Sequence, residues 1–104
     1  MTGCTHLDQV EMTELPEAVD GCEECLKTGG SWLHLRICLS CGKVGCCDSS
    51  PGRHASRHSL EAEHPLIRSL EPGEEWSFCF IDDVGMIIAD VEGQTRIPPS
   101  PLGG

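Results

Sequence analysis

In residues 31–37, with the sequence SWLHLRI, aliphatic residues alternate strictly with residues of other types. A period of two is typical of a β-strand that buries one face. The buried face is expected to carry Leu33, Leu35 and Ile37. The opposite face then carries a strip of larger side chains, namely Trp32, His34 and Arg36.

Further along the chain, residues 66–70 and 75–81 predict two strands joined by the turn sequence EPGE, and residues 86–91 predict a last strand. Turn-forming residues at positions 48–52 precede a helix expected over about 52–63, which Pro65 ends. Residues 7–20 are acidic with scattered apolar positions and predict a loop or an irregular strand. These elements indicate the α+β class.

A chain of 104 residues fits one small domain, which we expect over residues 1–93. Residues 94–104, QTRIPPSPLGG, are rich in Pro and Gly and predict a flexible tail. At this size an apolar core gives a modest margin of stability, so an additional cross-link is expected.

The composition supplies such a cross-link, because eight Cys and five His stand against four aromatic residues. Seventeen acidic residues against seven Lys plus Arg give a net charge of −10, which argues against binding to nucleic acid or to a membrane surface. No basic region precedes an apolar run at the N-terminus, and no segment approaches the roughly 18–20 apolar residues of a membrane span. We therefore expect a cytoplasmic protein, in which Cys pairs bind metal more often than they form disulfides. A secreted disulfide scaffold is the alternative.

Two Cys-x-x-Cys pairs, Cys22 with Cys25 and Cys38 with Cys41, have the spacing of zinc knuckles. Each pair needs two more ligands to complete a tetrahedron. The downstream candidates are Cys46 or Cys47, then His54, His58 and His64. Two four-ligand zinc sites can therefore form, with one Cys left over.

A third candidate set lies near the two ends of the chain, where Cys4-x-His6 is matched by Cys79-x-x-Asp82. A zinc ion held by these four residues would staple both ends of the domain. In the alternative interpretation, Cys79 is a buried core thiol and Asp82 is a turn residue. The expected cofactor is zinc, as two or three ions.

Catalytic interpretations fit these residues less well. The helix sequence HASRH has Ala55 where zinc proteases have the Glu that acts as general base, so a metalloprotease is not expected. The Cys-x-x-Cys pairs lack the βαβ context of a thioredoxin. We expect a protein that is not an enzyme. A thiol-based redox or metal-responsive protein, with Cys47 as the reactive thiol, is the alternative.

The order of the ligands and the segments CLSCGKVGCC, GRHASRH and EPGEEWSFCFID resemble the UBP-type zinc finger, above all its small bacterial members. The resemblance implies a twisted antiparallel sheet packed against one or two helices. It also implies three ligand sets: Cys22, Cys25, Cys46 and His54; Cys38, Cys41, His58 and His64; and Cys4, His6, Cys79 and Asp82.

Family members that bind ubiquitin hold its C-terminal Gly-Gly in a pocket lined by a Trp, an Arg and Tyr side chains. Trp32 matches the family Trp, whereas Asp48 occupies the position of the Arg and the chain has no Tyr. Because an acid repels a carboxylate, we do not expect ubiquitin to bind in the family manner. The strip of Trp32, His34 and Arg36 predicts instead a module that binds a peptide or protein C-terminal tail, such as a Gly-Gly end. An ordinary solvated strand face is the alternative.

Overall fold

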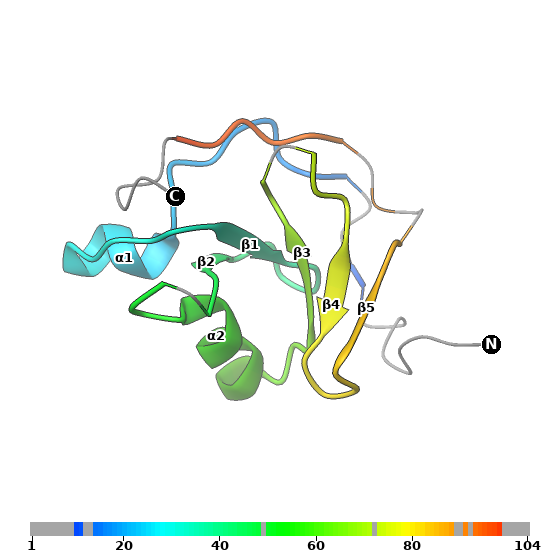
Figure 1. Ribbon diagram of the computed structural model, residues 1–104. Coiled ribbons are helices and arrows are strands. Elements are labelled where there is room, and N and C mark those ends of the chain that lie inside the picture. The colour runs from blue at the N-terminus through cyan, green and yellow to red at the C-terminus, as the bar shows by residue number, and fades with distance from the viewer. Residues whose placement is uncertain are drawn as a thin grey trace.

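One antiparallel sheet, in the strand order β2-β1-β3-β4-β5, forms the centre of the molecule (Figure 1). The structure is a computed structural model that describes residues 10, 11, 14–48, 50–71, 73–88, 91 and 93–98. The strands are β1 (Leu35–Cys38), β2 (Val44–Cys46), β3 (Leu66–Ser69), β4 (Ser77–Cys79) and β5 (Val84–Met86). Two helices, α1 (Glu23–Thr28) and α2 (His54–Ala62), complete the α+β fold, which confirms the predicted class. Neither helix is long enough to cross a membrane, and the described residues include no other helix.

The pairing register separates the two faces of the sheet. Leu35 lies opposite Cys46, and Ile37 lies opposite both Val44 and Arg68. Because directly paired residues share a face, these side chains lie together on the face that holds the apolar core. We call it the core face, and the opposite face, which carries Arg36 and Phe78, the helix face.

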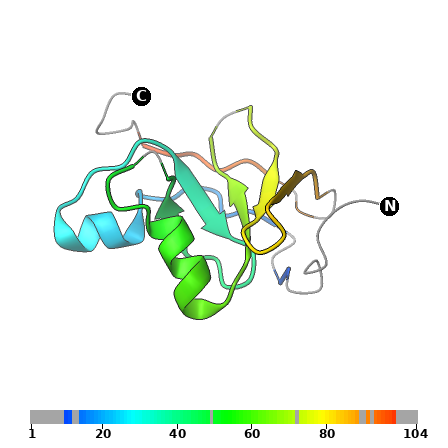
Figure 2. The same cartoon turned by 60° about the horizontal axis from the view of Figure 1, so that its bottom comes forward.

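Helix α2 packs on the helix face of the sheet, below it in the view of Figure 1 and in front of it in Figure 2. Gly45 of β2 permits this close contact. A Cβ atom at Gly45 would lie 2.7 Å from the backbone nitrogen of Ala55 and 2.9 Å from its Cα atom. The start of α2 is thereby placed directly against the edge strand.

Two extended terminal segments cover the core face and run side by side (Figure 1). Ala18 and Arg96 form a parallel bridge, in which the Val19 amide donates to the Arg96 carbonyl and the Arg96 amide to the Glu17 carbonyl, at 3.0 and 2.8 Å. The side chains of Leu15 and Ile97 pack against the core. Thr95 and Arg96, near the start of the segment expected to be a tail, are thus hydrogen-bonded to the domain, and residues 99–104 lie outside the described part.

Three local predictions differ from the structure. Residues 23–28 form a short helix, for which the sequence predicted no element beyond the Cys22–Cys25 knuckle. The last strand runs from Val84 to Met86 and so begins two residues before the predicted start at residue 86. It begins early because the β4–β5 turn closes at Asp83, whose φ is 54°. Regular pairing in β1 begins at Leu35, so the alternation does not extend to Trp32, and the predicted position of Trp32 on the strip is wrong.

Candidate metal centre

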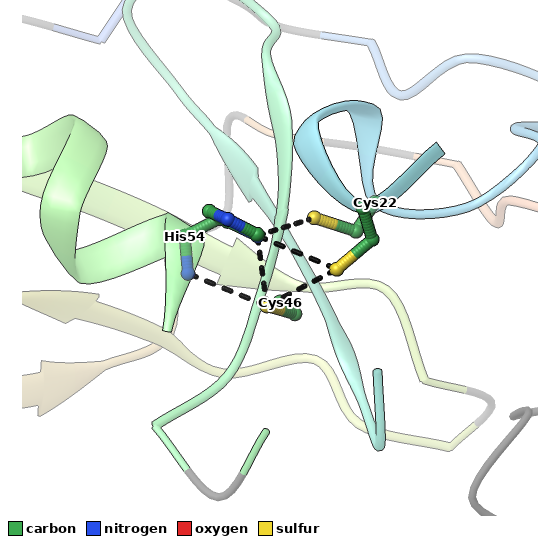
Figure 3. Close-up of side chains that lie close together, drawn as sticks. Cys22, Cys46 and His54 are labelled. Atoms are coloured by element: carbon green, nitrogen blue, oxygen red, sulfur yellow. Dashed lines mark hydrogen bonds between the residues drawn. The ribbon is translucent and has the colours of Figure 1, made fainter. Parts of the chain in front are cut away.

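Four side chains from three elements converge at one end of the sheet. Cys22 is the N-cap of α1, Cys25 lies in its first turn, Cys46 ends β2, and His54 begins α2. Their ligand atoms all lie within 4.8 Å of one another. Figure 3 shows the thiols of Cys22 and Cys46 pointing toward the ring of His54.

The separations of these atoms match the edges of a zinc tetrahedron. The Nδ1 atom of His54 lies 3.2, 3.4 and 3.4 Å from the sulfurs of Cys22, Cys25 and Cys46. The sulfurs of Cys25 and Cys46 are 4.0 Å apart. Zn–S bonds of about 2.3 Å and Zn–N bonds of about 2.0 Å at the tetrahedral angle give edges of about 3.5–3.8 Å. The four residues therefore fit one zinc ion.

The surrounding backbone holds this first set in place. The amide of His54, at the start of α2, donates a hydrogen bond to the Cys46 sulfur at 3.3 Å. The Glu23 carboxylate accepts from the Val44 amide at 2.7 Å, and Lys43 pairs with Glu24 at 2.8 Å. Helix α1 is thus attached to β2, and with it both of its cysteines.

A second set lies between the β1–β2 turn and the C-terminal half of α2. Its members are Cys38, Cys41, His58 and His64, again with ligand atoms within 4.8 Å of one another. The Cys38 sulfur lies 3.6 Å from Nδ1 of His64, and the Cys41 sulfur lies 3.2 Å from Nε2 of His58. Gly42, with φ of 82°, closes the knuckle by donating its amide to the Cys38 carbonyl at 2.8 Å.

The end of α2 places the last ligand of this set. Glu63 adopts the left-handed conformation with φ of 57°, and the amide of His64 donates to the Ser59 carbonyl at 3.2 Å. The chain therefore turns back toward the helix, and the rings of His58 and His64 meet edge to face with centroids 5.3 Å apart. Pro65 follows and prevents another helical turn.

Protonation of the ligands shows what a bound ion must supply. Burial raises the pKa of the thiols of Cys22 and Cys38. Burial together with the neighbouring Cys22 and Cys46 raises the pKa of Cys25 to about 12. Without metal these thiols hold their protons at neutral pH, so a divalent cation is needed to stabilise the thiolates side by side. Burial also lowers the pKa of His58, which keeps its ring neutral and able to bind metal.

The remaining candidate ligands are placed differently. Cys47 lies outside both sets, 3.5 Å from the hydroxyl of Ser50, so the structure places Cys46 and not Cys47 in the first set. Cys79 is fully buried on β4, and its sulfur accepts a hydrogen bond from the amide of Asp82 at 3.4 Å. Cys4 and His6 lie outside the described residues, so the third zinc site stays a prediction. None of the seven described cysteines is in a disulfide.

A pocket of about 270 Å³ lies on the helix face between α2 and β4. We call it the aromatic pocket. Its lining residues are His34, Arg36, Cys47, Asp48, Ala55, Ile67, Trp76, Phe78 and Phe80. The three aromatic residues alternate along the β4 segment and therefore point to one face. The Phe78 and Phe80 rings meet edge to face at 5.4 Å, and the Arg36 guanidinium stacks over Trp76 at 4.6 Å.

Of the predicted tail-binding strip, His34 and Arg36 reach this pocket and Trp32 does not. The Trp32 side chain is buried in the core, where its ring fills the space beside Gly21. The aromatic surface that the alternation predicted at Trp32 is supplied instead by Trp76 and its two partners. Their own alternation in the segment WSFCF was the signal that could have identified them.

Two four-residue Cys/His sets on a small α+β scaffold define the chain as a zinc-binding module. Residues 22–87 match the family described as the Zn-finger in ubiquitin-hydrolases and other protein, and the chain belongs to this family, as its sequence predicted. The chain is also similar to the solution NMR structure of protein RPA1320 from Rhodopseudomonas palustris, with 42% identity and a TM-score of 0.71, over 90% of this chain and 94% of that chain. No curated protein matches the chain.

Proposed function

We propose that this zinc-binding module is not an enzyme and that it binds the C-terminal tail of a peptide or protein in the aromatic pocket. The observation that carries the proposal is the combination of three aromatic rings and one arginine around about 270 Å³ of space. Pockets with predominantly apolar walls and few convergent polar groups are typical of ligand sites. Both zinc ions are structural in this proposal. The first set offers three thiolates and one imidazole and the second offers two of each, so neither leaves an open coordination position for a reacting water.

The size of the pocket favours a narrow ligand. Its volume lies near the lower end of known ligand pockets, which begin at about 300 Å³. Glycine residues, which have no side chain, are the residues that fit most easily between Phe78 and the wall formed by Ala55 on α2. A tail that ends in Gly-Gly therefore suits this space.

The charges of the pocket favour one orientation of such a tail. Arg36 is oriented by hydrogen bonds from its Nη1 atom to the Leu35 carbonyl at 3.0 Å and to the Ser69 hydroxyl at 3.3 Å. Asp48 contributes a negative charge to the same lining. A terminal carboxylate is attracted to Arg36 and repelled by Asp48, so the carboxylate belongs at the Arg36 side and a basic side chain of the tail beside Asp48.

Fluorescence polarisation with a labelled Leu-Gly-Gly peptide tests this proposal on the zinc-loaded protein. The peptide with a free carboxylate should bind, and the amidated peptide should bind at least about tenfold more weakly, because a charge-assisted hydrogen bond contributes about 1.5–3 kcal/mol. Arg36→Gln should cause a similar loss of affinity for the free-carboxylate peptide, and Phe78→Ala should weaken the binding of both peptides. The matched control is Arg57→Gln, which removes an exposed arginine from α2.

Two measurements separate a binding effect from a folding effect. Each variant should keep the zinc content of the parent by native mass spectrometry, because Arg36 and Phe78 are not ligands of either set. Equal affinity for the free and the amidated peptide, or unchanged affinity in Arg36→Gln, contradicts the proposed carboxylate position.

A further inference from the structure

A second and larger cavity, of about 720 Å³, opens on the core face of the sheet. It lies between the β3–β4 turn, at residues 70, 71 and 73–75, and the two terminal segments, at residues 15–17 and 93–97. We call it the terminal cleft. It is separate from the aromatic pocket, since the lining of the terminal cleft contains Arg68 and that of the aromatic pocket contains Arg36, which lie on opposite faces.

The wall of the terminal cleft contains a buried cation without a counter-ion among the described residues. Arg68 is 7% exposed, and its Nη1 atom donates to the Ser69 carbonyl at 3.2 Å. Arg68 takes part in none of the ion pairs found in the described part of the chain. Its neighbour across the strands, Ser77, is fully buried on the same face, and within that part the Ser77 hydroxyl has no hydrogen-bond partner.

Folded proteins rarely leave such groups uncompensated. A buried charge is costly unless an opposite charge and hydrogen bonds satisfy it, and a buried hydroxyl without a partner adds to that cost. Arg68 and Ser77 together offer guanidinium and hydroxyl donors on one face. Arg68 lines the terminal cleft, whereas Ser77 does not, so the charge of Arg68 points to an acceptor anion that enters from the cleft.

The rim of the cleft restricts which anion can enter. Four glutamates, Glu17, Glu71, Glu74 and Glu75, line it, and among the described lining residues Arg96 is the one exposed cation. A phosphate would carry two negative charges past these carboxylates, whereas a carboxylate carries one. A cationic group attached to that carboxylate would in turn be attracted to the glutamates.

We infer that the terminal cleft binds a zwitterion, with its carboxylate on Arg68 and its ammonium or guanidinium group among the rim glutamates. The cleft volume lies within the range of about 300–1,000 Å³ that is usual for small-molecule sites. A free basic amino acid and a peptide that ends in a basic residue share this chemistry.

NMR titration of the full-length, zinc-loaded protein tests the inference. The probes are L-lysine, L-lysinamide, acetate, inorganic phosphate and N-acetyl-Gly-Lys with a free carboxylate. L-lysine should shift the amide signals of residues 68–75 and 93–97 and the side-chain Nε signal of Arg68, and it should bind more tightly than acetate or phosphate. L-lysinamide, which lacks the carboxylate, should bind at least about tenfold more weakly. Tighter binding of the acetylated dipeptide than of L-lysine identifies a peptide end as the natural source.

Two variants assign the site to its residues. Arg68→Met removes the charge and keeps an unbranched apolar side chain, so L-lysine binding should fall by about tenfold or more while the ligand-free protein melts at the parent temperature or higher. Ser77→Ala removes a fully buried hydroxyl outside the cleft lining and should leave both the fold and L-lysine binding intact. Arg57→Met is the matched control on the surface of α2.

Several outcomes would overturn the inference. They are equal binding of L-lysine and L-lysinamide, parent-like L-lysine affinity in Arg68→Met, or shifts confined to the aromatic pocket. Should Arg68→Met fail to fold, equal binding of L-lysine and L-lysinamide by the parent protein overturns the inference alone. Tail binding in the aromatic pocket is monitored separately through the indole signal of Trp76, because Glu74 of the cleft rim lies 3.9 Å from Arg36 of that pocket.

Discussion

Replacing Gly45 by Ala should weaken zinc binding although Gly45 is not a ligand. The new Cβ atom would lie 2.7 Å from the Ala55 nitrogen, 2.9 Å from the Ala55 Cα and 3.1 Å from the carbonyl carbon of His54. All three neighbours are backbone atoms of α2, so no side chain can rotate away. The start of the helix must therefore move outward.

The size of the effect follows from these distances. Restoring an ordinary contact of 3.4 Å from 2.7 Å requires a displacement of about 0.7 Å. Zinc–ligand distances tolerate only about 0.2 Å. Overpacking of this kind costs about 1–3 kcal/mol, which corresponds to a loss of about 5–150-fold in affinity. The first ligand set should lose more than the second, because His54 adjoins the contact and His58 lies one turn further along α2.

Competition with a chromophoric chelator measures zinc affinity, and native mass spectrometry counts the ions that remain on each chain. The matched control is Gly85→Ala on β5, where the nearest neighbour of the new Cβ would be the Ser77 carbonyl oxygen at an ordinary 3.7 Å. The control should bind zinc as the parent does. If Gly45→Ala also retains two ions with parent affinity, the close contact between β2 and α2 does not position His54, and the reasoning is wrong.

Three further predictions concern the metal sites and the core. Cys41→Ser should lose the zinc ion of the second set and much of the folding stability, since structural zinc contributes about 10 kcal/mol or more in finger peptides. Cys47→Ser should keep both zinc ions when bound metal is counted. Zinc affinity should fall as the pH falls. The raised pKa values of the Cys22, Cys25 and Cys38 thiols mean that zinc binding near pH 7 releases at least three protons. Calorimetry in buffers of different ionisation enthalpy counts the released protons. Trp32→Ala should lower the free energy of unfolding of the zinc-loaded protein by about 3–5 kcal/mol and leave the affinity for the tail peptide unchanged. A selective loss of tail binding in this variant would show that Trp32 belongs to the binding site.

The ligands of the two described sets could be predicted from the sequence because their signal is local. A Cys-x-x-Cys pair has the spacing of a zinc knuckle, and His54 and His58 follow at helical spacing. The strands of the α+β fold were visible for the same reason, since alternation and turn residues act over a few positions.

The aromatic pocket was harder to predict, because it depends on where regular pairing begins. The alternation from residue 31 extends by pattern to Trp32, but the strand starts at Leu35, and Trp32 turns into the core beside Gly21. The terminal cleft was harder still to predict from sequence patterns. It depends on the pairing of segments 16–19 and 95–96, which are separated by the whole sheet along the chain.

Helix α2 presents one imidazole to each ligand set, and this arrangement links the occupancy of the two ions. The ion that binds first fixes the helix and thereby removes much of the ordering cost that the second would otherwise meet. Loading should therefore be cooperative, with few singly occupied molecules at equilibrium. A domain of this kind switches between folded and unfolded forms over a narrow range of free zinc, so its abundance in a cell follows the supply of the metal closely.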